Sequence, residues 1–126
     1  MNQLLLDTNV VVWLLLGDRD AVSPAARDAL DDEGNTLSVS AASVWEIAIK
    51  RSLGKLEIED RWPSALAALD VDHVPVTALH AQHVEGLPWH HRDPFDRLLV
   101  AQAIVESHTL VTADRQLAAY DVPVIW

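Results

Sequence analysis

The chain has 126 residues, 50 % of them hydrophobic, with no cysteine and a formal net charge of −10. That length allows one domain with a substantial core and is short for two, so we expect a single domain over residues 1–126. The missing cysteines exclude disulfides and thiolate metal sites. The acidity argues against a general nucleic-acid binder, which needs clustered lysine and arginine, and suits a basic protein partner.

The apolar segments are too short for a membrane protein. None approaches the roughly 20 residues that cross a bilayer. Asp7 interrupts the first apolar stretch, which also lacks the basic residues that begin a signal peptide. We therefore expect a soluble cytoplasmic protein with no membrane partner, and the lack of cysteine is compatible with a reducing compartment.

The N-terminal half alternates apolar strands with helices. Ser23 followed by Pro24 is typical of an N-cap and a first helical residue. Gly17 and Gly54 are suitable places for helices to end. In chain order we predict a strand at 3–6, helices at 10–16 and 25–31, a strand at 36–39, and a helix that begins after Ser40 or Ser43 and ends at Ser52.

The C-terminal half continues this alternation. Gly86 and Pro88 end one helical stretch, and Pro94 begins the longest. We predict helices at 61–69, 77–85, 94–107 and 115–120, and strands at 73–76, 109–112 and 122–125. Strands that alternate with helices through short connections indicate an α/β fold, with five parallel strands covered by helices on both faces.

Two acidic residues lie at ends of predicted strands. Asp7 follows the apolar run 4–6, and Asp114 follows the run 110–112. Ligands of such sheets bind beyond the carboxyl ends of the strands, where successive connections go to opposite faces. Each aspartate could instead cap the helix that follows it, which would stabilise that helix by about 1 kcal/mol.

Four neighbouring residues could support these acids. Thr8 and Asn9, in the turn after Asp7, could cap the helix or orient a carboxylate by hydrogen bonds. Thr112 precedes Asp114 by two positions and is a further supporting candidate. Asp93 comes directly before Pro94, so a capping role is favoured over a chemical one.

Two further acids are harder to explain as caps. Glu46 lies in the middle of an apolar helical stretch, where its alternative role is a surface pair with Lys50, worth about 0.3–0.5 kcal/mol. Asp96 falls at the third helical position, which suits the helix dipole but lies beside the apolar face that carries Val100 and Ala103. Together with the strand-end acids they predict one shared pocket for a divalent cation, and oxygen ligands select Mg²⁺ or Mn²⁺ over Zn²⁺.

Four segments resemble, in order, the motifs of PIN-domain ribonucleases. They are LLLDTN at 4–9, SVWEIAIK at 43–50, RDPFDRLLVAQA at 92–103 and LVTAD at 110–114. The motif at 92–103 and the small size are most similar to the toxin of VapBC-type toxin–antitoxin pairs. The resemblance implies a flavodoxin-like three-layer sandwich, Mg²⁺ or Mn²⁺ dependence, RNA as the substrate, and a homodimer bound by a cognate antitoxin.

The resemblance matches Asp7, Glu46, Asp96 and Asp114 to the acidic quartet of the family. We expect Asp7 and Asp96 to bind the ion most directly, with the other two acids completing the site directly or through water. The ion would lower the pKa of a bound water that attacks the phosphodiester in line. Because such an attack needs no 2′-hydroxyl, the cleaved RNA would carry a 5′-phosphate.

Basic and aromatic residues supply weaker candidates for RNA contact. Arg92, Arg97 and Arg115 could bind phosphates, although arginines in the first turns of helices are more often solvated or salt-bridged. The loop 89–92, with a tryptophan and two histidines, could touch RNA by stacking and charge. Three tryptophans at helical positions, Trp13, Trp45 and Trp62, are expected to lie in the core.

Three other functions compete with this hypothesis. A zinc site at the paired histidines lacks cysteine and a third ligand at suitable spacing. A haloacid-dehalogenase-like phosphatase needs an aspartate two residues after its nucleophile, and Asn9 occupies that place. A degenerate or receiver-like module that only binds a partner remains the non-enzymatic alternative, and it would tolerate loss of the acids.

Overall fold

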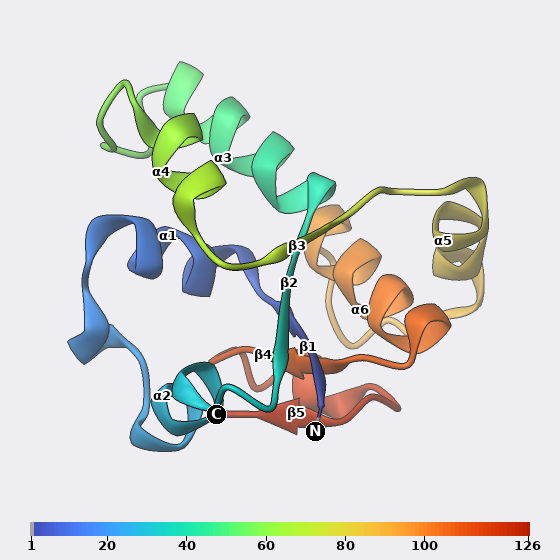
Figure 1. The fold of residues 1–126 in the computed structure, drawn as a ribbon. Helices are drawn as coiled ribbons and strands as arrows, with labels where there is room; N and C mark the ends of the chain where they lie inside the picture. The colour runs from blue at the N-terminus through green and yellow to red at the C-terminus, as the bar shows by residue number, and fades with distance from the viewer. Residues whose placement is uncertain (1) are drawn as a thin grey trace.

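Five parallel strands form the centre of the molecule (Figure 1). The computed structural model describes residues 2–126. The strands lie in the order β3-β2-β1-β4-β5, with the bounds β1 Gln3–Leu6, β2 Thr36–Ser40, β3 Asp72–Val74, β4 Thr109–Val111 and β5 Val124–Ile125. Every neighbouring pair is parallel. The prediction of an α/β fold with a five-stranded parallel sheet is confirmed.

Helices cover both faces of this sheet (Figure 1). They are α1 Thr8–Leu16, α2 Pro24–Asp31, α3 Ala41–Ser52, α4 Trp62–Ala68, α5 Ala78–His83 and α6 Pro94–Glu106, with 3₁₀ turns η1 Arg19–Ala21, η2 Val84–Gly86 and η3 Leu117–Ala119. Along β1 the side chains alternate between the faces, as the pleat of a strand requires. Leu4 and Leu6 join the core under α1 to α4, whereas Leu5 joins the core under α6.

Capping residues fix where several helices begin. Ser23 accepts a hydrogen bond from the Ala26 N–H at 3.1 Å and begins α2. Ser40, rather than Ser43, accepts one from the Ala42 N–H at 3.0 Å, so α3 begins where β2 ends. These caps satisfy N–H groups that have no partner within their helix.

The C-terminal segment departs from prediction. The expected helix at 115–120 is only the 3₁₀ turn η3, because the chain must return to the sheet by Val124 and leaves room for one tight turn. Pro123 has no N–H for a strand ladder, and β5 is confined to the two residues after it. Pro75 ends β3 after Val74 for the same reason.

The carboxyl ends of β1 and β4 define the crevice of the sheet. β1 and β4 are neighbours; the connection after β1 leads to β2 and the connection after β4 leads to β5, so the two connections go in opposite directions along the sheet. Leu6 is level with Val111, which places Asp7 beside Thr112 just beyond the strands. Within residues 2–126 no helix is both long enough and apolar enough to cross a membrane.

Candidate functional site

Asp7 lies buried between β1 and α1, with 4 % of its surface exposed. Its N–H donates to the Val111 carbonyl at 3.0 Å, which continues the sheet by one residue. Its Oδ2 accepts a hydrogen bond from Thr112 Oγ1 at 2.7 Å. Although Asp7 occupies the N-cap position of α1, its side chain makes no capping hydrogen bond, so its carboxylate faces the crevice rather than serving the helix.

The pKa of Asp7 is raised above its usual value. Burial is the largest cause, and the charges of Glu46 and Asp114 add to it. The Thr112 hydroxyl and the Thr8 backbone N–H oppose the shift by stabilising the ionised form. An aspartate whose charge is disfavoured by nearby acids is suited to a site that receives a cation.

Thr8 and Asn9 have different surroundings. Thr8 is buried and donates through Oγ1 to Ser43 Oγ at 2.9 Å, which ties α1 to α3 one turn before Glu46. Asn9 is exposed. Of the two, Thr8 therefore helps to place the acids, through its backbone N–H at Asp7 and through its hydroxyl on α3.

Glu46 projects from the middle of α3 and is 4 % exposed. Its Oε2 lies 2.7 Å from Lys50 Nζ, the i,i+4 pair expected from the sequence. Its Oε1 is buried without a hydrogen-bond partner among the described residues. An unsatisfied buried acceptor costs about 1–3 kcal/mol, and a cation in the crevice would satisfy it.

Asp96 and Asp114 approach each other at the start of α6 and the end of β4. His91 lies between them, with Nε2 at 2.9 Å from Asp114 Oδ2 and 3.2 Å from Asp96 Oδ2. The three side chains offer ligand atoms within 4.8 Å of one another. Asp114 Oδ1 also accepts the Gln116 N–H at 2.9 Å, so this residue joins a local turn and the acidic site at once.

The pKa of Asp96 is raised to about 7. Burial contributes most, followed by the charges of Asp7 and Asp93; His91 opposes the shift, and Glu46 makes a smaller contribution that raises the pKa. Asp93 itself caps α6, because its Oδ1 accepts the Asp96 N–H at 3.1 Å. The charges of neighbouring acids thus raise the pKa values of Asp7 and Asp96. We call Asp7, Glu46, Asp96 and Asp114 the acidic site.

The three arginines proposed to bind RNA are not equivalent. Arg97 is 3 % exposed, and its guanidinium donates to the Pro88 carbonyl at 2.8 Å and the Val84 carbonyl at 3.1 Å. The prediction of an RNA contact is therefore wrong for Arg97, which instead holds the loop before α6. Arg92 and Arg115 are exposed, as a phosphate contact requires.

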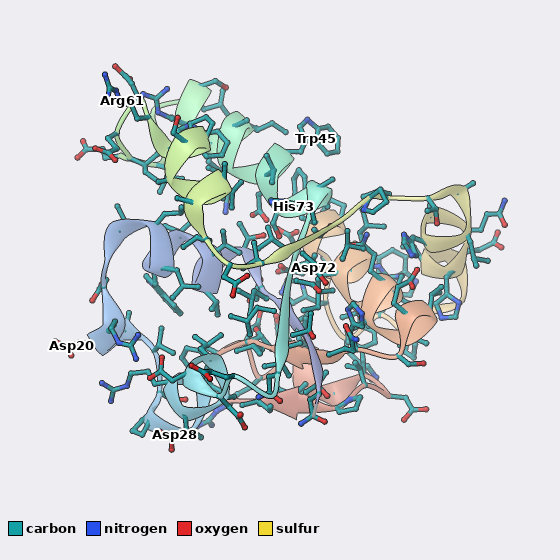
Figure 2. All side chains as sticks on the ribbon, in the orientation of Figure 1. Asp20, Asp28, Trp45, Arg61, Asp72 and His73 are labelled. Atoms are coloured by element: carbon teal, nitrogen blue, oxygen red, sulfur yellow. The ribbon has the colours of Figure 1, made fainter. Side chains whose placement is uncertain are left out.

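Trp45 also differs from expectation. It is 61 % exposed and packs edge-on against Phe95, with ring centroids 5.2 Å apart. Figure 2 shows it projecting from α3 away from the sheet. Trp62 is buried, as predicted. The helix α3 has apolar residues on more than one face, so the sequence did not identify the buried one.

Sequence reasoning missed His91 as a member of the acidic site. The histidines of this loop suggested only a zinc site or an RNA contact. A usable signal is its position two residues before the N-cap Asp93, where the chain turns back over the start of α6. That position brings its ring to the two carboxylates.

The donor set fits a hard divalent cation. The four acids supply only oxygen atoms, which Mg²⁺ and Mn²⁺ prefer. The raised pKa values of Asp7 and Asp96 and the unpartnered Glu46 Oε1 indicate more negative charge than the described side chains neutralise. Lys50 is the ammonium paired with this group, and it reaches only Glu46 Oε2.

Solved structures with a similar fold include a chain of the VapBC2 complex from Rickettsia felis bound to promoter DNA. It has a TM-score of 0.74 and 18 % identity, and the match covers 97 % of this chain and 96 % of that one. A toxin–antitoxin complex from Klebsiella pneumoniae has a TM-score of 0.68 and 20 % identity, and the match covers 97 % of this chain and 95 % of that one. The PIN domain endonuclease Utp24 has a TM-score of 0.54 and 17 % identity, and the match covers 97 % of this chain and 82 % of that one. At these identities the likeness concerns the fold.

A comparison with curated protein sequences gave no match. The model of the PIN domain family, in contrast, matches residues 4–123. This match contains β1 from Leu4 onward, β2, β3 and β4, but not β5, and it contains all four members of the acidic site. The chain therefore belongs to the PIN domain family.

Proposed function

We propose that this PIN domain is a Mg²⁺- or Mn²⁺-dependent endoribonuclease and the toxin of a VapBC-type toxin–antitoxin pair. The observation that carries the proposal is the acidic site at the crevice of the sheet, with Glu46 Oε1 buried and unpartnered among residues 2–126. Burial and the charges of neighbouring acids raise the pKa values of Asp7 and Asp96, which favours the uptake of a cation. A cytoplasmic location is part of the proposal.

In this proposal Asp7 and Asp96 hold the ion most directly. Thr112 keeps the Asp7 carboxylate in place through its hydroxyl, and Glu46 and Asp114 complete the site directly or through water. A bound Mg²⁺ or Mn²⁺ lowers the pKa of a water molecule and offsets charge on the scissile phosphate. The exposed Arg92 and Arg115 would attract the RNA backbone.

A basic protein segment is the partner that this chain fits. Its net charge is −10, and the acidic site concentrates part of that charge at one end of the sheet. The solved structures with a similar fold from Rickettsia felis and Klebsiella pneumoniae are complexes with an antitoxin. We propose that a cognate antitoxin binds this chain, as a homodimer, and places a basic side chain near the acids.

The test is cleavage of a labelled RNA with single-stranded loops by the purified protein, in Mg²⁺, in Mn²⁺ and in EDTA. Asp7→Asn and Asp96→Asn should each reduce the rate by at least about a hundredfold, because each removes a charge that holds the ion. Glu106→Gln is the matched control, since it removes a carboxylate far along α6 from the acidic site. It should leave the rate within about twofold.

Cleavage that persists in EDTA, or that survives in both folded aspartate variants, would refute the nuclease mechanism. Thermal unfolding of each variant confirms that it is folded. A protein that binds the metal and an antitoxin but cleaves none of the RNAs would instead support the partner-binding module.

A further inference from the structure

His91 is the side chain that joins two members of the acidic site. It is half-buried, and its Nε2 contacts Asp114 Oδ2 at 2.9 Å and Asp96 Oδ2 at 3.2 Å. A histidine in this position could serve the site in three ways: as a metal ligand, as an occupant that competes with the metal, or as a hydrogen-bond donor that orients the carboxylates. The hydrogen bond made by the other ring nitrogen, Nδ1, decides whether Nε2 is free to be a metal ligand.

The proton of the ring is placed by the backbone. Nδ1 lies 2.9 Å from the Asp93 N–H, which can only donate. Nδ1 must therefore accept this hydrogen bond and carry no proton, so the proton of the imidazole is on Nε2. Nε2 then donates to the Oδ2 atoms of Asp96 and Asp114 and has no lone pair for a metal.

The loop holds the ring in this orientation. The His91 N–H donates to Tyr120 Oη at 3.1 Å, and the same oxygen accepts from Arg97 Nη1 at 3.2 Å. Arg97 also fixes the preceding carbonyls of the loop, and its guanidinium carbon lies 3.8 Å from the centre of the Trp89 ring. Ligation through Nε2 would require the proton to move to Nδ1, where it would face the Asp93 N–H.

We propose that His91 is a positioning residue: it links Asp96 to Asp114 through Nε2–H, and the metal is bound by oxygen atoms alone. This inference rests on the proposed metal site. Each Oδ2 atom that accepts from His91 is held toward the ring, which leaves Asp96 Oδ1 and the remaining lone pairs for the ion. Without an imidazole ligand the site favours Mg²⁺ and Mn²⁺ over Zn²⁺.

The experiment uses Mn²⁺ as the probe, with its binding followed by EPR and its ligands by pulsed EPR. Wild type should bind Mn²⁺ without the coupling of a directly coordinated imidazole nitrogen. His91→Leu, which removes the donor, should weaken Mn²⁺ binding by about 10–100-fold. His91→Gln keeps an N–H near the position of Nε2 and should restore affinity to within about threefold of wild type.

Imidazole ¹⁵N shifts of the wild-type protein supply a second measurement that needs no variant. The Nε2–H tautomer of His91 should be present in the metal-free protein and should persist in Mg²⁺. Tyr120→Phe is a milder variant, because it removes the acceptor of the His91 N–H and leaves the ring in place. It should weaken Mn²⁺ binding by less than His91→Leu does.

Three results would overturn the inference. They are a coordinated imidazole nitrogen that disappears in His91→Leu, Mn²⁺ binding by His91→Leu that is as tight as or tighter than wild type, and an Nδ1–H tautomer in Mg²⁺. A wild-type protein that binds no Mn²⁺ would refute the proposed metal site itself. The two failures are therefore distinguishable.

Discussion

Near each end of the sheet, a histidine side chain contacts a carboxylate. At the carboxyl end His91 contacts Asp96 and Asp114. Near the amino end, beside a hollow of about 450 Å³ that Asp72 and His73 also line, His80 Nε2 lies 2.7 Å from Glu106 Oε1 (Figure 2). In both histidines Nδ1 accepts a backbone N–H, from Asp93 at 2.9 Å and from Thr77 at 3.1 Å.

The two ends differ in the amount of negative charge that no nearby cation neutralises. His80 is 1 % exposed, completes the capping box of α5 and faces one carboxylate that is 44 % exposed to water. His91 faces two carboxylates beside two more, and burial and neighbouring charges raise the pKa values of Asp7 and Asp96. A histidine–carboxylate contact by itself therefore does not identify a functional site, whereas a buried surplus of negative charge does.

The largest expected effect is a gain of stability on removing a charge at the carboxyl end. In metal-free protein the pKa of Asp96 is about 7, against 3.8 for an unperturbed aspartate. The folded state therefore holds a proton that the unfolded state has lost between these values, so the unfolding free energy falls as the pH rises through this window. Asp96→Asn should raise that free energy by about 2–4 kcal/mol at pH 8 and much less near pH 4.5.

Denaturant unfolding in EDTA at several pH values measures this difference. The control at the other end is Glu106→Gln, which weakens the hydrogen bond to His80 and should lower the unfolding free energy at pH 8 by about 0.5–1.5 kcal/mol. If Asp96→Asn were less stable than wild type at pH 8, the carboxyl end would hold no destabilising negative charge, and the two ends would not differ in this respect.

Metal binding should stabilise the carboxyl end next most strongly. Mg²⁺ or Mn²⁺ at about a hundred times its dissociation constant should raise the unfolding free energy by about 2.7 kcal/mol. Binding releases the proton of Asp96, whose pKa is about 7, so at a fixed metal concentration the gain should be larger at pH 8 than at pH 5.5. Thermal unfolding with increasing metal tests this, and equal gains at both pH values would contradict it.

The substitutions His80→Gln and His91→Leu should have opposite profiles. His80→Gln should lower the unfolding free energy by about 1–3 kcal/mol, because it leaves the Thr77 N–H and a buried position poorly satisfied, with cleavage within about twofold of wild type. His91→Leu, at a half-buried position, should lower the unfolding free energy by less than about 1 kcal/mol, but it should reduce cleavage at limiting metal by at least about tenfold because it weakens metal binding. Unfolding and cleavage are measured on the same samples, and similar profiles would argue that both histidines are structural.

The smallest effect should come from neutralising Asp93 while its cap is kept. Asn also accepts the Asp96 N–H, so Asp93→Asn should change the unfolding free energy by no more than about 0.5 kcal/mol at neutral pH. Because the charge of Asp93 raises the pKa of Asp96, the pH dependence of stability should move to lower pH. Asp93→Ala, which loses the cap, should lower the unfolding free energy by about 1 kcal/mol. An equal loss of unfolding free energy in Asp93→Asn and Asp93→Ala would show that the charge of Asp93 matters more than its cap.

Much of the fold could be predicted because its signals are local. The apolar runs that end at Asp7 and Asp114 define two neighbouring parallel strands, and parallel strands bring such residues to one edge of the sheet. Glu46 was identified because an acid inside an apolar helix has few structural roles. These inferences needed only spacing, caps and strand ends.

The rest depended on contacts between distant segments. The burial of Arg97 follows from carbonyls at 84, 87 and 88 that turn toward it, and no pattern in the sequence reports where a loop points its carbonyls. His91 joins the acids for the same reason. The helix expected at 115–120 failed because tertiary structure, and not the preference of its residues, sets how soon the chain must return to the sheet.

Only Asp7 separates β1 from α1, and no residue separates β2 from α3. Asp7 therefore lies on one of these junctions and Glu46 on the helix that follows the other, and neither junction has a loop to rearrange. Most of the conformational entropy of ordering them is lost when the chain folds, so little remains to be lost when an ion arrives. The backbone at these two junctions should be superimposable between the metal-free and metal-bound protein, and differences between them should be confined to the loop that carries His91.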